Sequence, residues 1–425
     1  MISQRLFVSF TLLLLAYSPT DRLATCDAQS SEVTTPSGPE TPEASLAPAS
    51  DTAPAAAGEE AAAMGGSLPI ELTEEGEQAK AEFLEVLKAY RDKVTEMRVI
   101  HTRYINGEQQ TPEARQSFVD AELRTRQLMD DLFEASYKLL MFAPDEEAAQ
   151  YLLTMIQHQY ENSNYSEWTL QAGSLLMDLG FKQIFLYRAV ARAAVCTGHF
   201  ELARKVYKHM DEEGFADLDK RFSFQMDEIE QLWQQEAEAR EADATKNLPR
   251  VLIKTTKGDM VVELFLDVAP STVANFISLV EQGFYDGLDF YQVKDDLLAL
   301  TGDETGLGSG DSGRYVIDEH QREGARNAFR GSLAMAKLPS KEGSFFENTA
   351  STQFAIFFTP LPAVSQQQTV FGRVIEGMDL FTEIRRVDPN KDKSNETMIR
   401  PPDRIITAEV LRKPEEMPEP VYFTP

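Results

Sequence analysis

The sequence predicts a multidomain protein: an α-helical N-terminal domain, either repeat-like or a bundle, followed by an all-β domain that forms a closed barrel with two short helices. Two observations support this fold class. From Glu71 to about Ala244 the apolar residues recur with the period of a helix, whereas from Arg250 onward they alternate as in strands. The chain has 425 residues, which is enough for two or three domains.

The charge balance and the histidine spacing indicate which kinds of ligand and partner to expect. There are 41 Lys and Arg residues against 69 Asp and Glu residues, a formal net charge of −28, and no basic cluster interrupts this acidic balance. Such a surface repels phosphate backbones, so we expect no nucleic-acid partner. No metal or other cofactor is predicted, because the five histidines show no ligand spacing: His101, His158, His199, His209 and His320.

Residues 1–28 have the pattern of a signal peptide. Arg5 provides the positive charge, and the apolar run from Leu6 to Tyr17 is too short to span a bilayer comfortably. Cleavage before Gln29 would export the protein to the periplasm or the extracellular space. The alternative, a lipid anchor on Cys26, is disfavoured because Thr25 fits a lipidation motif poorly, and no other apolar run is long enough to span a membrane.

Residues 29–69 form an acidic, Pro- and Ala-rich linker. It contains no aromatic residue and no Lys or Arg. Such a segment cannot bury enough apolar area to offset the entropy lost on ordering, so we expect it to be disordered.

Residues 70–245 are expected to form the α-helical domain. Five apolar residues share one face of a predicted helix: Phe83, Leu87, Tyr90, Val94 and Met97. Further helices are expected to start at Thr111-Pro112 and near Pro144, where a capping residue, a proline or a run of acids opens the apolar pattern.

Part of this domain resembles a tetratricopeptide repeat. The small and aromatic residues of one copy are Gly198, Phe200, Ala203 and Tyr207, and a second group one repeat length upstream is Tyr165, Trp168 and Ala172. In such repeats the small residue lets neighbouring helices approach and the aromatic ring fills the groove. An irregular helical bundle explains the same pattern, so both alternatives stay open, and a protein partner on this domain is one function it could serve.

Residues 250–412 are expected to form the barrel, and residues 413–425 a C-terminal tail. The stretch "RVLIKTTKGDMVVELFLD" is typical of two strands joined by a Lys-Gly turn, and "STVANFISLVEQG" of a capped helix. "GRVIEGMDLFTEIRRVD" indicates a strand followed by a short helix, and "RIITAEVLRK" a closing strand. Many strands with two short helices favour a barrel.

Residues 251–411 resemble the cyclophilin-type peptidyl-prolyl isomerases. The matching blocks occur in order: "GDMVVELFLDVAPSTVANFISLV", "GFYDGLDFYQV", "GDETGLGSGDSGRYVIDE", "GSLAMA", "STQFAIFF" and "VFGRVIEGMDLFTEI". The resemblance implies a cyclophilin-like barrel and a proline-containing polypeptide as ligand. It also implies that the glycine-rich loop connects strands beside the pocket, because that loop lacks the Gly-Lys-Ser/Thr ending of a phosphate-binding loop.

The resemblance also assigns the candidate site. In this family an arginine donates a hydrogen bond to the prolyl nitrogen as rotation about the X–Pro bond removes its conjugation, and here that catalytic position is Gln292. The implied substrate-binding positions are Leu297, Leu298, Leu300, Ala336, Gln353, Ala355, Val364 and Gln368.

Most of these positions lack the family's residue. An uncharged amide at residue 292 could by itself cost about 10²–10³ in rate, the typical effect of losing one preorganised donor. Leu297-Leu298 replaces the Phe-Met pair that walls the proline pocket, Ala355 replaces an aromatic ring, and Lys337 replaces an asparagine. Lys294, two residues beyond Gln292 on the same strand face, is an alternative donor.

Three functions follow. The first is an exported cyclophilin-type protein that binds proline-containing segments with weak or no isomerase activity. The second is an active but slow peptidyl-prolyl isomerase that assists extracytoplasmic protein folding. The third is a scaffold whose helical domain binds a protein partner.

We predict that the mature protein begins at or near Gln29, because the short apolar run after Arg5 is typical of a cleaved leader. N-terminal sequencing of the protein purified from its native host measures this directly. A mature chain that still begins at Met1 contradicts the prediction.

Overall fold

The computed structural model describes residues 72–105, 111–340, 344–388 and 401–423. The predicted signal peptide 1–28 and linker 29–69 lie outside the described residues. The chain divides into two compact units, Met1–Ala143 and Pro144–Pro425. Among the described residues, no helix has both the length and the apolar character needed to cross a bilayer.

The first unit contains two long helices that pack against each other, α2 (Glu74–Ile105) and α3 (Pro112–Phe142). The predicted apolar face of α2 is buried along its whole length, from Phe83 to Met97. The helix start predicted at Thr111-Pro112 is confirmed, since α3 begins at Pro112. At the surface, Lys138 Nζ lies 2.5 Å from Glu82 Oε2 and links the two helices.

The second unit begins with five helices and a short 3-10 turn. They are α4 (Glu146–Glu161), α5 (Glu167–Asp178), α6 (Ile184–Thr197), α7 (Phe200–Lys208), η2 (Glu212–Gly214) and α8 (Asp217–Asp243). The start predicted near Pro144 is confirmed, because the Asp145 side chain caps α4 by accepting the amide of Ala148 at 3.0 Å. Ser166 and Thr169 form a capping box at the start of α5.

The tetratricopeptide-like reading of these helices is not confirmed. Gly198 ends α6 with φ +87°, a conformation that favours glycine, and the indole of Trp233 lies where a β-carbon would project. Ala203 and Tyr207 are buried as a repeat would require, but Trp168 is 45% exposed. Glycine is therefore required at position 198 because it ends α6 in a left-handed conformation and leaves room for Trp233 of α8.

The rest of the second unit is β-rich. Its strands are β1 (Arg250–Thr255), β2 (Asp259–Leu264), β3 (Gln292–Lys294), β4 (Leu298–Thr301), β5 (Tyr315–Val316), β6 (Ser332–Met335), β7 (Phe354–Phe357), β8 (Val370–Glu376), β9 (Ile405–Arg412) and β10 (Tyr422–Phe423). Its helices are α9 (Pro270–Glu281), α10 (Pro362–Ser365) and α11 (Met378–Thr382).

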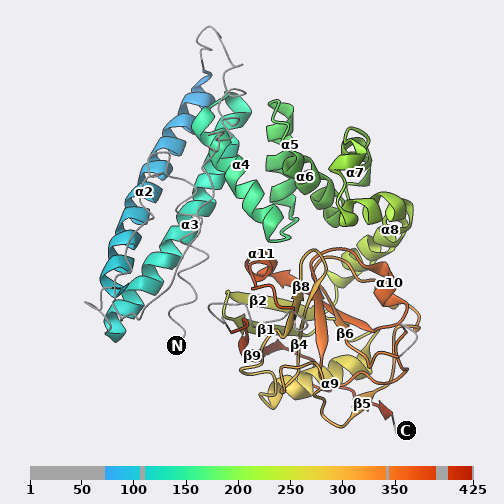
Figure 1. The fold of residues 1–425 in the computed structure, drawn as a ribbon. Helices are drawn as coiled ribbons and strands as arrows, with labels where there is room; N and C mark the ends of the chain where they lie inside the picture. The colour runs from blue at the N-terminus through green and yellow to red at the C-terminus, as the bar shows by residue number, and fades with distance from the viewer. Residues whose placement is uncertain (1–71, 106–110, 341–343, 389–400, 424–425) are drawn as a thin grey trace, which may run out of the picture. The chain divides into compact units, whose positions relative to one another are not determined.

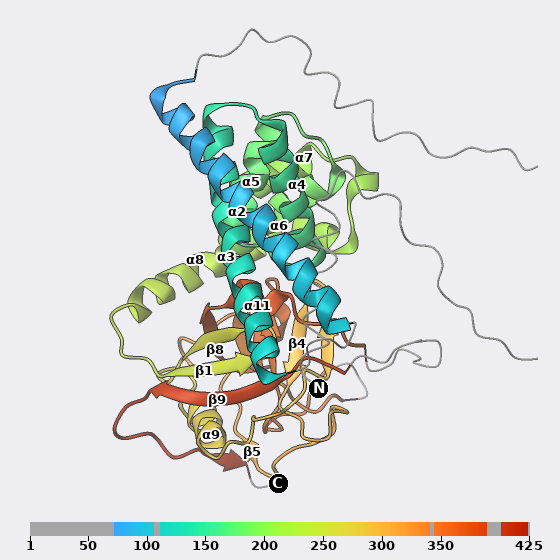
Figure 2. The same ribbon diagram turned by 90° about the vertical axis from the view of Figure 1, so that its left-hand side faces the viewer.

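Eight of the strands form one antiparallel sheet in the order β3-β4-β7-β6-β8-β2-β1-β9, and the sheet curls strongly (Figures 1 and 2). The predicted fold class is confirmed, with one refinement: the sheet is a half-barrel. Between its end strands β3 and β9 no continuous ladder forms in the described residues, and isolated bridges such as Asp289–Arg404 lie there instead. In the described part of this region, three short helices, rather than two, accompany the strands.

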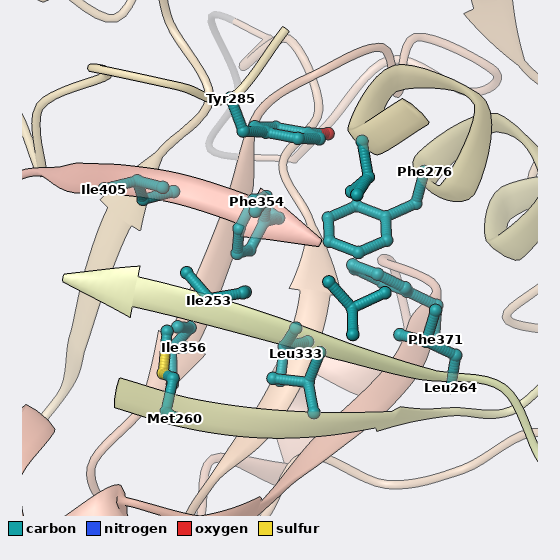
Figure 3. Packing of buried hydrophobic residues seen from close by; sticks show 14 of the residues in the cluster. Ile253, Met260, Leu264, Phe276, Tyr285, Leu333, Phe354, Ile356, Phe371 and Ile405 are labelled. Atoms are coloured by element: carbon teal, nitrogen blue, oxygen red, sulfur yellow. The ribbon is translucent and has the colours of Figure 1, made fainter. Parts of the chain in front are cut away.

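The concave side of the sheet holds the main apolar core. Phe276 of α9 packs edge-on against Phe354 of β7, with ring centroids 5.4 Å apart, and lies 5.2 Å from the ring of Phe371 on β8 (Figure 3). Tyr285 closes this aromatic group and donates its hydroxyl hydrogen to the carbonyl of Thr352 at 3.0 Å. Because side chains alternate along each strand, only every second residue enters this core.

The half-barrel and helices α4–α8 belong to the same compact unit. Arg326, which is buried, donates hydrogen bonds to Glu236 at 2.8 and 2.9 Å and to Asp243 at 2.7 Å, both on α8. Trp233 of α8 packs edge-on against Phe329 at 5.0 Å. The boundary predicted at residues 245–250 separates helices from strands along the sequence, but it does not separate two compact units in space.

A second buried arginine joins these helices to the half-barrel. Arg192 of α6 forms a two-pronged pair with Asp219 of α8, at 2.8 and 2.9 Å, and its Nη1 lies 2.8 Å from Asp296 in the turn between β3 and β4. Cys196 lies one turn farther along α6 and is also buried. Burial raises the pKa of the Cys196 thiol to about 12.

We predict that Arg326→Met lowers the free energy of unfolding by about 3 kcal/mol, because it leaves the carboxylates of Glu236 and Asp243 buried without their main partner. Arg204→Met is the matched control: this arginine also faces several carboxylates, but its side chain is 32% exposed, so its loss should cost at most about 1 kcal/mol. Urea unfolding of both variants measures the difference. Equal losses contradict the buried role of Arg326.

Candidate functional site

The candidate site lies on the face of the sheet opposite the main core. Strand register places Gln292 of β3 opposite Leu300 of β4, Leu300 opposite Ala355 of β7, and Ala355 opposite Ala334 of β6. Leu298, Leu300, Ala355 and Val364 belong to one apolar cluster, separate from the main core, which also contains Phe265, Phe357 and Val370. Four of the predicted substrate-binding residues are therefore brought together.

Gln353 lies at the edge of this cluster, and both ends of its side-chain amide are engaged. Its Oε1 accepts the hydroxyl hydrogen of Tyr291 at 2.5 Å, and its Nε2 donates to the carbonyl of Gly310 at 2.7 Å. Its backbone carbonyl accepts the amide of Ala336 at 2.9 Å, so these two predicted residues are neighbours. Burial, together with the nearby charge of Asp303, raises the pKa of Tyr291, which keeps the phenol protonated as a donor.

The glycine-rich loop is held by one carboxylate. Asp303, which is buried, accepts hydrogen bonds from the hydroxyl and amide of Thr305 at 2.8 Å and from the amides of Leu307 at 2.9 Å, Gly308, Ser309 at 3.1 Å and Gly310 at 2.9 Å. Burial alone would raise the pKa of Asp303, but these donors outweigh it and the pKa lies below its ordinary value. The amides that a phosphate would need are therefore occupied by the protein's own carboxylate.

Lys337, at the position where the resemblance implies an asparagine, points away from solvent. Its Nζ donates to Asp318 Oδ2 at 2.6 Å and to the carbonyl of Gln367 at 2.9 Å, and its side chain is only 2% exposed. This pair fastens the segment that carries Val364 and Gln368 to the end of β6. The ammonium group is consequently engaged inside the protein.

Gln292 is half-buried, and its side-chain amide has no hydrogen-bond partner among the described residues. Lys294 lies two residues on, opposite Leu298, and is exposed. Both project from the same face of β3, as the period of a strand requires. The role of Lys294 as an alternative donor stays a prediction.

The remaining predicted residues lie at the margin of the cluster. Leu297 is half-buried in the turn before β4, and its carbonyl accepts the amide of Phe358 at 2.8 Å. Gln368 is buried between α10 and β8, and its amide donates to the carbonyl of Val364 at 2.9 Å. Sequence reasoning missed the roles of Tyr291 and Asp318. Tyr291 stands beside Gln292 in a matching block and could have been found, whereas no local signal connects Asp318 with Lys337.

A half-barrel of this topology with an apolar cluster on its outer face defines a cyclophilin-like domain. The family model for cyclophilin-type peptidyl-prolyl cis-trans isomerase/CLD matches residues 250–410. A peptidyl-prolyl cis-trans isomerase-like 1 protein of Neurospora crassa is 31% identical over 165 residues, which are 38% of this chain and 94% of that protein. A peptidyl-prolyl cis-trans isomerase of Helicobacter pylori is 34% identical over 138 residues, 32% of this chain and 80% of the relative.

Among solved structures, a cyclophilin type peptidyl-prolyl cis-trans isomerase of Cryptosporidium parvum is 29% identical, with a TM-score of 0.33, and the match covers 39% of this chain and 99% of that one. The chain belongs to the cyclophilin-type peptidyl-prolyl cis-trans isomerase family. Members of this family bind proline-containing peptide substrates. Helices α2–α8 lie outside the matched residues.

We predict that Asp303→Asn destabilises the protein by about 1–3 kcal/mol at pH 7, because an amide cannot satisfy the ring of donors that the carboxylate accepts. The folded-state pKa of Asp303 is depressed, so its stabilisation is present above the unfolded-state pKa of about 3.9 and is lost as the pH falls through the lower folded-state pKa. Urea unfolding of parent and variant should therefore converge toward acid pH. A difference that does not depend on pH contradicts this assignment.

Proposed function

We propose that this cyclophilin-family protein is exported and binds proline-containing polypeptide segments with weak or no isomerase activity. The observation that carries the proposal is Gln292, an uncharged side chain at the position where the family has its catalytic arginine. The signal-peptide pattern of residues 1–28 supports export, to the periplasm or the extracellular space.

Rotation about an X–Pro bond has a barrier of about 18–20 kcal/mol, because resonance stiffens the amide. A catalyst lowers this barrier only if its interactions are stronger in the twisted state than in the planar one. A charged donor aimed at the prolyl nitrogen meets this condition, since the nitrogen gains a lone pair as it loses conjugation. The amide of Gln292 is a weaker donor, so the twisted state gains little over the planar state.

Binding of a proline peptide requires apolar surface but no charged donor at the prolyl nitrogen, and the site provides such surface. Leu298, Leu300 and Val364 are partly exposed and offer apolar surface for a prolyl ring, without a tight aromatic wall, beside the buried Ala355. Gln353 and Lys337 are engaged by Tyr291, Gly310, Asp318 and Gln367 and are not free to reorganise around a twisting substrate. These features favour binding of a proline-containing ligand without catalysis of its isomerisation.

A slow isomerase that assists extracytoplasmic protein folding is the second candidate. The half-buried amide of Gln292 lacks a partner in the described residues and retains hydrogen atoms to donate, and Lys294 projects from the same strand face. A flexible ammonium is a poor replacement for a planar guanidinium, because it holds no fixed direction. The two candidates differ in turnover, and a proline-peptide isomerisation assay separates them.

We predict that Gln292→Arg alone raises kcat/KM for a short Ala-Pro peptide only slightly, because a donor helps only when the prolyl ring is held within its reach. Combining it with Leu297→Phe, Leu298→Met and Ala355→Phe should raise kcat/KM by more than the sum of the separate effects. The measurement is isomerisation by a protease-coupled assay or by NMR line shapes. The triple wall variant without Gln292→Arg is the matched control.

Ala355 is buried, so a phenylalanine there could overpack the cluster and cost about 1–3 kcal/mol. Circular dichroism and thermal unfolding of every variant therefore accompany the kinetics. A parent protein as active as an ordinary cyclophilin contradicts the proposal and points to Lys294 or another donor. A folded combined variant that stays inactive shows that the site differs in backbone shape as well as in side chains.

A further inference from the structure

The tight turn that joins β3 to β4 leads directly into the apolar cluster of the candidate site. It is closed by the amide of Leu297, which donates to the carbonyl of Lys294 at 3.3 Å. Asp296 occupies the turn with φ +59°, a left-handed conformation that glycine adopts freely and that Asp and Asn adopt more readily than most other residues. The next two residues are Leu297 and Leu298, both at substrate-binding positions of the family.

Asp296 is held from three directions. Its backbone amide donates to Ser163 Oγ at 3.0 Å, and its backbone carbonyl accepts the hydroxyl hydrogen of Thr359 at 2.6 Å. Its carboxylate accepts the hydroxyl hydrogen of Tyr165 at 2.6 Å and a guanidinium hydrogen of Arg192 at 2.8 Å. Three of these four contacts come from the segment between α4 and α5 or from α6.

The groups behind these contacts are themselves fixed. Arg192 is almost fully buried and also donates to Asp219 and to the hydroxyl oxygen of Tyr165. Ser163 is buried with φ +56°, so both partners of the backbone contact lie in conformations that the surrounding structure must maintain. Arg330 holds the residue next to Ser163. It donates hydrogen bonds to the side chains of Asn164, at 2.5 Å, and of Asp379, at 3.0 Å.

We infer that Asp296, held by Ser163, Tyr165 and Arg192, is the positioning residue through which helices α4–α6 set the shape and the ligand affinity of the proline site. This inference rests on the proposed function, since it concerns the same site. The turn cannot shift without moving Leu297 and Leu298, because Leu297 is also fixed to Phe358 by a backbone hydrogen bond and Leu298 packs in the apolar cluster.

A consequence of this coupling is reciprocity. If docking of α6 and of the segment between α4 and α5 on the turn raises the affinity of the site for a proline peptide, then binding of the peptide must stabilise that docking by the same factor. The helices would then act as part of the binding unit, and any event that loosens them would release the ligand.

The test compares two glycine variants in the full-length protein. Asp296→Gly removes the carboxylate contacts, while glycine accepts the φ of +59° without strain and Arg192 keeps both hydrogen bonds to Asp219. Asp295→Gly is the matched control: it lies in the same turn and gains the same unfolded-chain entropy, but its carboxylate is 67% exposed. Its partner Arg386 also donates to Ser163 Oγ at 3.2 Å, and the carbonyls of Thr382 and Ile384 still hold that arginine when Asp295 is replaced.

We expect Asp296→Gly to weaken binding of an Ala-Ala-Pro-Phe peptide about fivefold, the scale of a modest coupling between sites, and Asp295→Gly to leave it unchanged. Affinity is measured by NMR titration, and thermal unfolding confirms that both variants are folded. Hydrogen exchange supplies a measurement that a purely structural role would not alter. Peptide binding should slow amide exchange in α5 and α6 of the parent and of Asp295→Gly, but not of Asp296→Gly.

Each outcome decides one question. Equal peptide affinities in the parent and Asp296→Gly overturn the inference, as does peptide protection of α5 and α6 that survives in Asp296→Gly. A parent that binds no proline peptide overturns the proposed function instead. In that case the inference is judged without ligand: exchange of the Gln292–Leu300 amides should be faster in Asp296→Gly than in Asp295→Gly, and equal exchange rejects it.

Discussion

The second unit depends on the pairing of Arg192. A guanidinium with so little exposed surface is stable only if its hydrogens find acceptors, since removing a charge from water is costly. Burial alone would lower the pKa of Arg192, but its hydrogen bonds to Asp219 and the charge of Asp296 raise the pKa above its ordinary value. α6, α8 and the half-barrel must all be in place to supply these acceptors, so the helices and the sheet form one structure.

The two faces of the strands contribute to different parts of the domain. Val293, Ala299, Phe354 and Ile356 point into the main core, and the residues between them point toward the candidate site. Because the period of a strand is two, the residues that stabilise the fold and the residues that define the site are different sets. A family fold can therefore be kept while the residues around a ligand change.

The fold was largely predictable because its signals are local. The glycine at the end of α9, the Lys-Gly turn between β1 and β2 and the apolar face of α2 can each be recognised within a short window. The family's blocks likewise located Gln292, Leu300 and Ala355 on neighbouring strands. The barrel's incomplete ladder was not predictable, because it depends on how β3 and β9 end.

The contacts around the site were harder to predict, for a physical reason. Ser163 and Asp296 are 133 residues apart in the chain, and Lys337 finds Asp318 through the folding of two loops. A lysine at a position where the resemblance implies an asparagine suggests an exposed cation, yet its ammonium is buried because a carboxylate and a carbonyl lie within reach. No window of the sequence contains both partners of such a pair.

Cys196 gives this arrangement a built-in chemical reporter. Its thiol lies one helical turn from Arg192, and because only a thiolate reacts readily, a pKa near 12 leaves it inert in the folded protein at neutral pH. Reaction with a thiol reagent then requires that α6 first move away from its neighbours. When α6 closes faster than the reagent reacts, the rate of labelling reports the fraction of molecules in which α6 is open, multiplied by the reactivity of the exposed thiol, without any introduced probe.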